Sequence, residues 1–319
     1  MMRVAAVDLG TNSTRLLVAD VDDGRLDDVV RRVKITRLGE GVDERKRLLP
    51  GPIARVRNVL VDFRREIQEL GAERTLLVAT SAVRDGENGE AFLGEIEWSY
   101  GFATRLLSGD EEAHLTFLGA ALGRDLAAET LLLDIGGGST EFVVGGADGP
   151  RFHESLDFGS VRLTERFLHT DPPSADELDA CARAVRELID MRIPSDLRPM
   201  TAIGVAGTIT SIAALDLGLD EYDPEQVHGH RLSRAGVAAQ LERLAALPLA
   251  ERREVAALDP ERAPVIVAGA VILQEALDRF GLDGIEASEH DILDGAALEA
   301  AKLPEPEEGA APPGAYTCC

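Results

Sequence analysis

An aspartate that ends an apolar stretch and precedes a bare glycine turn is the first chemical feature of this sequence. In LLLDIGGGST (131–140), Asp134 follows three leucines and stands beside a run of glycines. Glycines expose backbone N–H groups and let a ligand approach closely, and such groups can converge on phosphate oxygens. The candidate phosphate-binding residues of this turn are Gly136, Gly137, Gly138 and Ser139.

The same design occurs a second time near the start of the sequence. VAAVDLGTNSTRLLV (4–18) aligns without a gap with TLLLDIGGGSTEFVV (130–144), which pairs Asp8 with Asp134. Each copy predicts a β-hairpin with an Asp-x-Gly-x-x-Ser-Thr turn. Because the apolar flanks match too, we interpret the repeat as a duplication whose two halves face each other, so that both turns meet in one cleft. The first copy contributes the candidate phosphate donors Asn12 and Ser13.

A third loop and a metal ion complete the predicted phosphate site. Gly207 and Thr208 open a helix, and a helix N-terminus favours an anion through its N–H groups and its dipole. A carboxylate beside a phosphate repels it unless a cation lies between them. Asp8 and Asp134 therefore predict a Mg²⁺ that is held mainly through water.

Three charged side chains allow more than one interpretation. Arg84 could supply a planar fork for phosphate oxygens, or it could only pair with Asp85 or Glu87. Glu111 and Glu112 stand in the first turn of a predicted helix, where the helix dipole favours acids whatever their function. The residues alone do not choose between these alternatives.

Other kinds of catalytic site are not evident. His228 and His230 have a spacing that suits neither face of a helix, and no third metal ligand is evident, so we expect a loop or core role for both. No Ser/His/Asp set stands out, and there is no GxxxxGK[ST] loop.

The turns need an α/β framework to position them, and the hydrophobic pattern predicts one. Ser108 and Glu111 fit a capping box that starts a helix. A strand that runs on into a polar loop is predicted in 75–85. Further strands are predicted at 103–109, at the start of 200–215 and at the start of 285–301. Helices are predicted at 55–72, 174–191, the end of 200–215, 261–281 and the end of 285–301.

Length and composition fit a protein of two domains. The chain has 319 residues, of which 45% are hydrophobic, and no apolar run is long enough for a transmembrane helix. The first residues show no separate charged, apolar and cleavage regions, so we expect a cytoplasmic protein. Cys181, Cys318 and Cys319 form no disulfide framework or CxxC motif, and the last two are interpreted as part of a flexible tail.

The charge is strongly acidic and unevenly distributed. The net charge of −24 argues against general binding of nucleic acid. Residues 1–75 nevertheless hold 15 Lys/Arg and 13 Asp/Glu. The basic residues between 31 and 65 are either solvated faces or a local basic lip for a polyanion, and composition does not choose between the two.

Together these features resemble the superfamily of sugar and acetate kinases, actin and the heat-shock chaperone ATPases. Within it, TSAVRDGEN (80–88), SGDEEAHLTFLGA (108–120), LLLDIGGGSTE (131–141) and FGSVRLTERF (158–167) resemble the exopolyphosphatase/guanosine pentaphosphate phosphohydrolase family. TRLGEGVD (36–43), VAGTITSIAAL (205–215) and the helix at 261–273 agree. The match covers nearly all of residues 3–302. Gly86 and Thr11 depart from residues that are common in the family, without loss of a needed group.

The resemblance implies a role for each candidate residue. It implies that Glu112 is the general base for the attacking water, that Asp134 lies beside Mg²⁺ and this water, and that Arg84 lies near the terminal phosphates. Asp8 matches the first-turn carboxylate and a second metal ligand. The residues that match the phosphate loops are Thr11, Asn12, Ser13, Gly136, Gly137, Gly138, Ser139, Gly207 and Thr208.

We therefore expect an α/β protein of two ribonuclease-H-like domains, 1–124 and 125–303, that face an interdomain cleft. The closing helix could pack back on the first domain, and 304–319 is expected to be a disordered tail. The expected activity is Mg²⁺-dependent exopolyphosphatase activity. The alternatives are hydrolysis of guanosine pentaphosphate, a silent polyphosphate- or nucleotide-binding regulator, and a sugar-kinase-like transferase.

The same resemblance bears on partners and substrate length. It implies that a homodimer is possible, whereas the expectation of no nucleic-acid and no membrane partner comes from the net charge and from the lack of a long apolar run. Longer family members continue into further C-terminal helical domains that help to hold long chains. This shorter form is therefore expected to prefer short polyphosphate.

Overall fold

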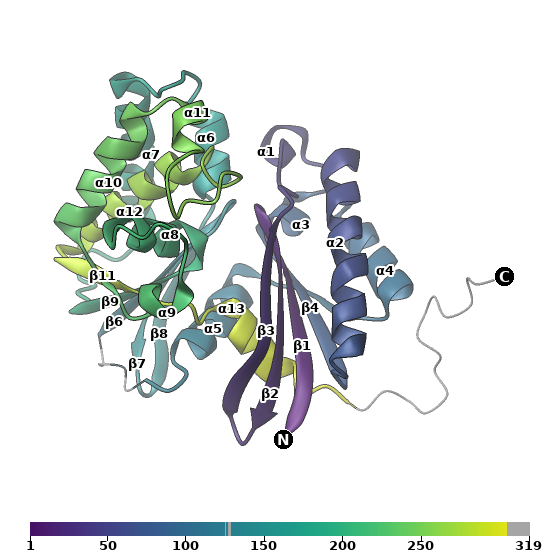
Figure 1. Cartoon of the computed structure of the whole chain (residues 1–319). Helices are drawn as coiled ribbons and strands as arrows, with labels where there is room; N and C mark the ends of the chain where they lie inside the picture. Colours follow the sequence, from purple (N-terminus) through teal and green to yellow (C-terminus); the bar gives the residue numbers. More distant parts are fainter. Residues whose placement is uncertain (125, 127–128, 305–319) are drawn as a thin grey trace. The chain divides into compact units, whose positions relative to one another are not determined.

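The computed structural model describes residues 1–124, 126 and 129–304. It divides into two compact units, Met1–Gly123 together with the segment from Ile292 onward, and Arg124–Asp291 (Figure 1). Each unit is built on one mixed β-sheet with helices on both faces.

Among the described residues of the first unit, the strands form a sheet in the order β3-β2-β1-β4-β5. β1, β2 and β3 are antiparallel neighbours, whereas β4 runs parallel to β1 and β5 runs parallel to β4. The strands are β1 (Met2–Leu9), β2 (Ser13–Asp22), β3 (Arg25–Ile35), β4 (Arg74–Ala79) and β5 (Ala103–Leu106). The helices are α1 (Val42–Arg45), α2 (Pro50–Glu69), α3 (Ser81–Asp85), α4 (Gly89–Tyr100), α5 (Gly109–Ala120) and α13 (Ile292–Ala300).

The central strand β1 is buried on both sides, as expected for a strand of a parallel sheet that is covered by helices on both faces. Ala5, Val7 and Leu9 join the core under α2 and α4. Val4 and Ala6 point the other way and join a core with α5 and α13. The side-chain period of two residues thus gives the sheet two separate apolar faces.

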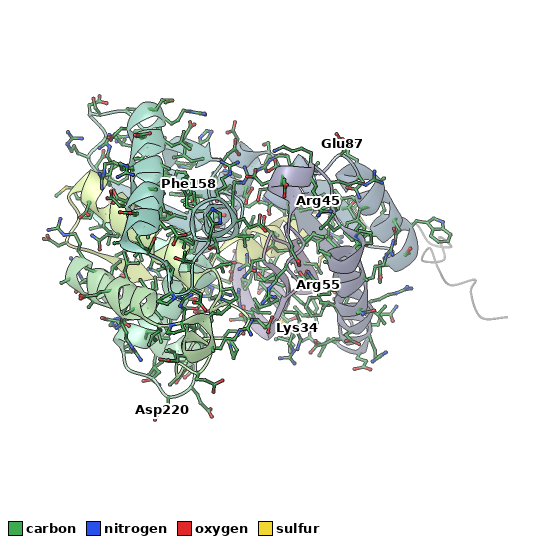
Figure 2. The ribbon with its side chains drawn as sticks, turned by 90° about the horizontal axis from the view of Figure 1, so that it is seen from above. Lys34, Arg45, Arg55, Glu87, Phe158 and Asp220 are labelled. Carbon is green, nitrogen blue, oxygen red and sulfur yellow. The ribbon has the colours of Figure 1, made fainter. Side chains whose placement is uncertain are left out.

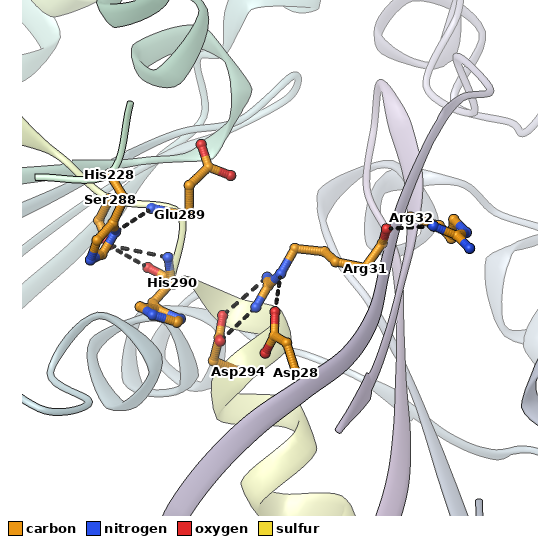
Figure 3. A network of polar contacts seen from close by, with 8 residues as sticks. All are labelled: Asp28, Arg31, Arg32, His228, Ser288, Glu289, His290 and Asp294. Carbon is orange, nitrogen blue, oxygen red and sulfur yellow. Dashed lines mark hydrogen bonds and ion pairs between the residues drawn. The ribbon is translucent and has the colours of Figure 1, made fainter. Parts of the chain in front are cut away.

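An ion pair fastens α13 to the sheet edge. Asp294 is fully buried on α13, and its Oδ1 and Oδ2 accept hydrogen bonds from Arg31 on β3 at 2.7 Å and 3.3 Å (Figure 3). Asp28 also accepts from Arg31, at 2.9 Å. Gly295 lies directly against α5, because a Cβ there would be 2.0 Å from the carbonyl oxygen of Leu115. The last helix therefore supports the helix that carries Glu112.

The second unit repeats the first. Its described strands form a sheet in the order β10-β11-β9-β6-β7-β8, in which β6-β7-β8 is an antiparallel meander and β9 runs parallel to β6. The strands are β6 (Thr130–Ile135), β7 (Thr140–Gly146), β8 (Gly149–Leu156), β9 (Thr201–Val205), β10 (Arg231–Ser233) and β11 (Gly284–Ala287). The helices are α6 (Ser160–Phe167), α7 (Ala175–Arg192), α8 (Ala206–Asp216), α9 (Pro224–Val227), α10 (Arg234–Ala246), α11 (Leu249–Arg252) and α12 (Ile266–Phe280).

The shared strand order confirms the predicted α/β fold of two ribonuclease-H-like halves. The repeated hairpins are β1-β2 and β6-β7, and their strands occupy the same places in the two sheets. The sequence pattern did not predict the third meander strands, β3 and β8. Whether the two halves face a common cleft stays a prediction.

Several element boundaries differ from the predicted ones for local reasons. The helix expected from residue 261 begins at Ile266, because Pro264 lacks the N–H that a continuing helix would need. The polar loop expected after β4 contains the short helix α3. The segment after β9 enters α8 directly at Ala206 without a separate turn.

The division of the chain differs from the expected ranges at one element. The first unit ends at Gly123, next to the boundary predicted at 124. α13 lies within 125–303 but belongs to the first unit, which the prediction allowed by letting the closing helix pack back on the first domain. The predicted tail beyond Pro304 lies outside the described residues, together with Cys318 and Cys319. No helix in the described part of the chain is long and apolar enough to cross a membrane.

Two neighbouring arginines on β3 give a matched test of the α13 anchor. Arg31→Ala leaves the buried Asp294 without its main counter-charge, so we expect the free energy of unfolding to fall by about 2–4 kcal/mol. Arg32→Ala removes an exposed pair with Glu66 and should cost about 1 kcal/mol or less. Urea unfolding of both variants measures the difference. Equal losses would show that the Arg31–Asp294 pair is not an anchor.

Stability at low pH depends on the cap of α7. Hydrogen bonds from the Thr170 hydroxyl and the Ser174 backbone N–H lower the pKa of Glu177 from 4.5 to about 2. A depressed carboxyl pKa stabilises the fold above the unfolded pKa, and this contribution is lost as pH falls from about 4.5 towards about 2. We expect Glu177→Gln to flatten the fall of the unfolding free energy over this range. Glu187→Gln, on the exposed side of the same helix, is the control and should leave the pH dependence of the unfolding free energy as in wild type. Urea unfolding at several pH values measures both variants.

Candidate active site

Both predicted turns fold in the same way. The backbone N–H of Gly10 donates to the carbonyl oxygen of Ser13 at 3.0 Å, and that of Gly136 donates to Ser139 at 3.1 Å. Each bond closes a tight turn between two antiparallel strands, directly after the strand that carries the aspartate. The predicted repeat therefore extends from the sequence to the backbone geometry of the turns.

In the second unit, the carbonyl groups of the glycine turn accept hydrogen bonds from the start of α6. The backbone N–H of Ser160, at the start of α6, donates to the carbonyl oxygen of Gly136 at 2.9 Å. The N–H of Val161 donates to Gly137 O at 2.9 Å, and Arg162 does so at 3.1 Å. Gly159 allows this close approach, because a Cβ there would lie 2.4 Å from the carbonyl carbon of Gly137.

The first unit uses a different segment for the same purpose. Gly39 N–H donates to the carbonyl oxygen of Thr11 at 2.9 Å, and the N–H groups of Thr36 and Arg37 donate to Asn12 O at 3.0 and 2.9 Å. A Cβ on Gly39 would be 2.2 Å from Cγ2 of Thr11. Thr11 and Gly137 occupy equivalent positions of the repeat, so each copy has a glycine packed against the same point of its turn.

Several backbone N–H groups of the two turns remain available, although the carbonyl groups of the same turns are hydrogen-bonded. In the described chain, the backbone N–H groups of Gly137, Gly138 and Ser139 have no hydrogen-bond partner, and neither do those of Thr11 and Asn12. Within the same residues, the buried Oδ1 of Asn12 also lacks a partner. Successive unpaired N–H groups of this kind form an anion-binding nest. Both turns can therefore bind phosphate oxygens through the backbone.

The third predicted loop begins α8. Ala206 has a φ of 65°, in the left-handed region that non-glycine residues rarely adopt. The Arg262 guanidinium lies against Gly207, since a Cβ on Gly207 would be 1.8 Å from Nη1 of Arg262. Thr208 is buried and packs against Gly269 of α12. This helix start thus combines a positive dipole end with an arginine, which suits an anion.

Glu112 and Arg84 meet in the first unit. Glu112 is 6% exposed in the first turn of α5, and Arg84 Nη1 lies 3.3 Å from its Oε2. The same nitrogen donates to the carbonyl oxygen of Leu107 at 2.8 Å. Among the described residues, the Arg84 guanidinium thus contacts Leu107 and Glu112 and not the neighbouring acids of its own loop. The remaining donors of the guanidinium fork can serve an anionic ligand.

The neighbouring Glu111 has a structural task. Its Oε2 accepts from the backbone N–H of Ser108 at 2.8 Å, and its own N–H donates to Ser108 Oγ at 3.2 Å, which confirms the predicted capping box. The hydrogen bond from the Ser108 N–H lowers the pKa of Glu111. The structure therefore separates the two acids, because Glu111 caps α5 while Glu112 is buried beside Arg84.

The two copies differ in what faces the aspartate. In the first, Asp8 lies opposite Arg15 in the strand register, and Oδ2 of Asp8 is 2.9 Å from Nε and 2.8 Å from Nη2 of Arg15. In the second, Asp134 lies opposite Glu141. Asp134 is 6% and Glu141 1% exposed, so two buried carboxylates lie side by side. The register thus places a cation opposite the first aspartate and a second carboxylate opposite the other one.

The Asp134–Glu141 pair fits a hard divalent metal ion. Mg²⁺ is typically bound by one or two carboxylates and keeps several waters. Ser155 Oγ donates to Glu141 Oε1 at 2.9 Å, which orients this carboxylate. The described residues hold no cluster of three or more His, Cys, Asp or Glu that could form a complete metal site. Water and substrate oxygens would therefore have to supply the other ligands.

The two histidines have separate partners, in line with the role expected for them. His228 Nδ1 accepts from the backbone N–H of Glu289 at 3.2 Å (Figure 3). His230 Nε2 lies 2.9 Å from Asp216 Oδ2. The free thiol of Cys181 is buried, and burial raises its pKa to about 12, which leaves it without nucleophilic character at neutral pH.

Each unit gathers its own share of the predicted site. In the first unit, the Thr11 hydroxyl lies 2.8 Å from Ser81 Oγ at the start of α3. The same helix contains Arg84, which contacts Glu112. In the second, β6 and β9 are parallel neighbours, so the Asp134 turn and the Gly207 helix start lie at the same sheet edge. Ligands of open α/β sheets bind at this carboxyl edge of the strands.

Sequence reasoning missed Glu141, Arg262, Gly159 and Gly39. A signal for Glu141 was present, because a turn closed between residues 136 and 139 places 134 opposite 141. The other three depend on tertiary packing between segments that lie far apart in the sequence. No local pattern identifies them.

Comparison with known proteins agrees with this geometry. A model of the Ppx/GppA phosphatase family matches residues 17–302. Exopolyphosphatase 2 of Mycobacterium tuberculosis is 40% identical over 319 aligned residues, which cover 94% of this chain and 99% of that protein. The crystal structure of an exopolyphosphatase-like protein aligns with a TM-score of 0.88 at 38% identity and covers 94% of this chain and 99% of its own.

A second solved structure extends the likeness. The Ppx/GppA enzyme of Aquifex aeolicus aligns with a TM-score of 0.79 at 32% identity, over 93% of this chain and 99% of its own. Family model, relatives and structures agree over nearly the whole described chain. From its sequence and its fold, the chain belongs to the Ppx/GppA phosphatase family.

Proposed function

We propose that the protein is an exopolyphosphatase that hydrolyses the terminal phosphoanhydride of inorganic polyphosphate. The observation that carries the proposal is the pair of anchored turns, whose N–H groups suit phosphate oxygens. The name of the M. tuberculosis relative supports polyphosphate as the substrate. Phosphoryl transfer needs positioning and charge neutralisation more than covalent help, and the described site residues offer both.

Glu112 acts as the general base in this proposal. A water molecule attacks the terminal phosphorus, the bridging P–O bond breaks, and Glu112 accepts the proton of the water. The products are orthophosphate and a chain shorter by one unit. Leu107 and Glu112 fix Arg84, whose other N–H groups neutralise charge on the phosphate. A positioned base of this kind contributes about 10²–10⁴-fold to the rate.

Asp134 and Glu141 hold Mg²⁺ in this proposal. When bound, the ion offsets charge on the phosphate oxygens and lowers the pKa of water. The proposal favours this pair over Asp8 as metal ligands, because Arg15 already compensates Asp8. The Gly137–Ser139 N–H groups bind the phosphate oxygens directly. The cytoplasmic location and the homodimer remain proposals that rest on the resemblance.

Two adjacent glutamates test the assigned base. We expect Glu112→Gln to lower kcat for phosphate release by about 10²–10⁴-fold with little change in KM, because only the proton acceptor is lost. Glu111→Gln keeps an oxygen that can accept from the Ser108 N–H in the capping box, so it should retain the fold and most of the activity. Phosphate release and thermal unfolding are measured for both. Full activity in Glu112→Gln would refute the assignment.

The metal site is tested by binding as well as by activity. We expect Asp134→Asn and Glu141→Gln each to weaken Mg²⁺ binding by about tenfold or more in calorimetry, since each loses an ionised ligand. Phosphate release should depend on Mg²⁺ and stop with a chelator. Asp8→Asn is the matched comparison and should retain Mg²⁺ affinity. Loss of Mg²⁺ binding in Asp8→Asn alone would place the ion on the other copy.

A substrate panel tests the function itself. Wild type is assayed with long polyphosphate, tripolyphosphate, guanosine pentaphosphate and ATP. We expect the highest kcat/KM with polyphosphate. Activity only towards guanosine pentaphosphate would establish the alternative hydrolase, and release from none of the four would refute the proposed function.

A further inference from the structure

The basic residues of the first unit are concentrated in one stretch. Residues 31–57 hold nine Lys/Arg and three Asp/Glu in a chain whose net charge is −24. Several of these cations have structural partners. Arg31 pairs with Asp294, Arg32 with Glu66, Arg55 with Glu40, and Arg57 with Glu95.

Four other cations of this stretch make no close ion pair with a carboxylate. The side chains of Lys34, Arg45 and Arg47 are exposed and have no hydrogen-bond or ion-pair partner among the described residues. Lys46 makes only a loose pair, with Nζ 3.7 Å from Asp43 Oδ1, and its side chain is 60% exposed. In an acidic protein with many available carboxylates, such a group of unpaired cations is a candidate contact for an anion.

The segment that carries these cations connects the two phosphate-site loops of the first unit. At one end, Gly39 N–H donates to Thr11 O at 2.9 Å. At the other end, the carbonyl oxygen of Lys46 accepts from Glu87 N–H at 2.9 Å, on the loop that follows Arg84. Figure 2 shows Arg45 and Glu87 close to each other at this end, and Lys34 and Arg55 towards the other.

The segment is also held firmly. Leu38, Val42 and Leu48 are at most 3% exposed and join the core of the first unit. Asn88 binds Leu48 twice, accepting from its N–H at 2.8 Å and donating to its carbonyl oxygen at 3.1 Å. A fixed backbone with outward cations binds an extended anion with little loss of conformational entropy.

We propose that Lys34, Arg45, Lys46 and Arg47 form a cationic track that binds the inner phosphates of a polyphosphate chain whose terminal phosphate is at the Thr11 and Arg84 loops. This inference rests on the proposed function and deepens it by assigning to the same site a preference for longer chains, in contrast to the short polyphosphate that the family resemblance led us to expect. A long polyanion contacts several cations at once, whereas tripolyphosphate and guanosine pentaphosphate offer few phosphates beyond the reacting one. The track therefore selects polyphosphate chains of more than a few units.

The test compares two triple variants that lose the same charge. Lys34→Gln/Arg45→Gln/Arg47→Gln removes the unpaired cations. Arg25→Gln/Arg57→Gln/Arg65→Gln is the control, at the far end of β3 and on α2. We expect the track variant to raise KM for long polyphosphate by about tenfold and to weaken its dependence on salt, because fewer counterions are released. Its kcat, and its kcat/KM for tripolyphosphate, should stay within about twofold of wild type.

Three outcomes would overturn the track. An unchanged KM for long polyphosphate would show that the cations are a solvated face. An equal loss with both substrates, or an equal loss in the control variant, would show a general charge effect.

Direct binding separates this proposal from the enzymatic one. Affinity for long polyphosphate is measured by calorimetry on Glu112→Gln, with and without the three track substitutions. A loss of affinity of about tenfold supports the track even if wild type releases no phosphate, which would refute only the proposed function. Equal affinity with and without the track substitutions refutes the track even if wild type is active.

Discussion

The site depends on one constraint. The carbonyl groups of each turn must accept hydrogen bonds from another segment of the same unit, which fixes the turn while its own N–H groups stay available. Ser160–Arg162 provide this for the glycine turn, and Thr36–Gly39 provide it for the first copy. In both units the third meander strand brings the chain back to the turn, so β3 and β8 are needed for more than the sheet. Gly39 and Gly159 are required because any side chain there would displace the turn.

The two copies of the repeated fold contribute different charged residues to the predicted site. The first turn keeps its aspartate but neutralises it with Arg15, and the same unit supplies Glu112 and Arg84. The second turn has Glu141 where the first has Arg15, which creates a buried pair of acids suited to a cation. The charge of the residue opposite the aspartate is thus what distinguishes the two copies, and it is the reason for proposing the second copy as the metal site.

Local chemistry was predictable from the sequence, and tertiary contacts were not. The repeat, both hairpin turns and the cap at Ser108 follow from short-range patterns, and the structure confirms them. The roles of Gly159 and Arg262 depend on segments that are brought together only by folding. The pattern also could not separate Glu111 from Glu112, because both suit a first helical turn, and only burial beside Arg84 distinguishes them.

The most direct test of the account is an NMR titration of ¹⁵N-labelled Glu112→Gln protein with tripolyphosphate in the presence of Mg²⁺. The account predicts that the amide signals of Gly137, Gly138 and Ser139 move downfield and saturate, because their unpaired N–H groups acquire phosphate oxygens. The Gly136 amide, which already donates to Ser139, should move little. Saturating binding that leaves the three amides unchanged would contradict the central claim that the glycine turn holds the phosphate.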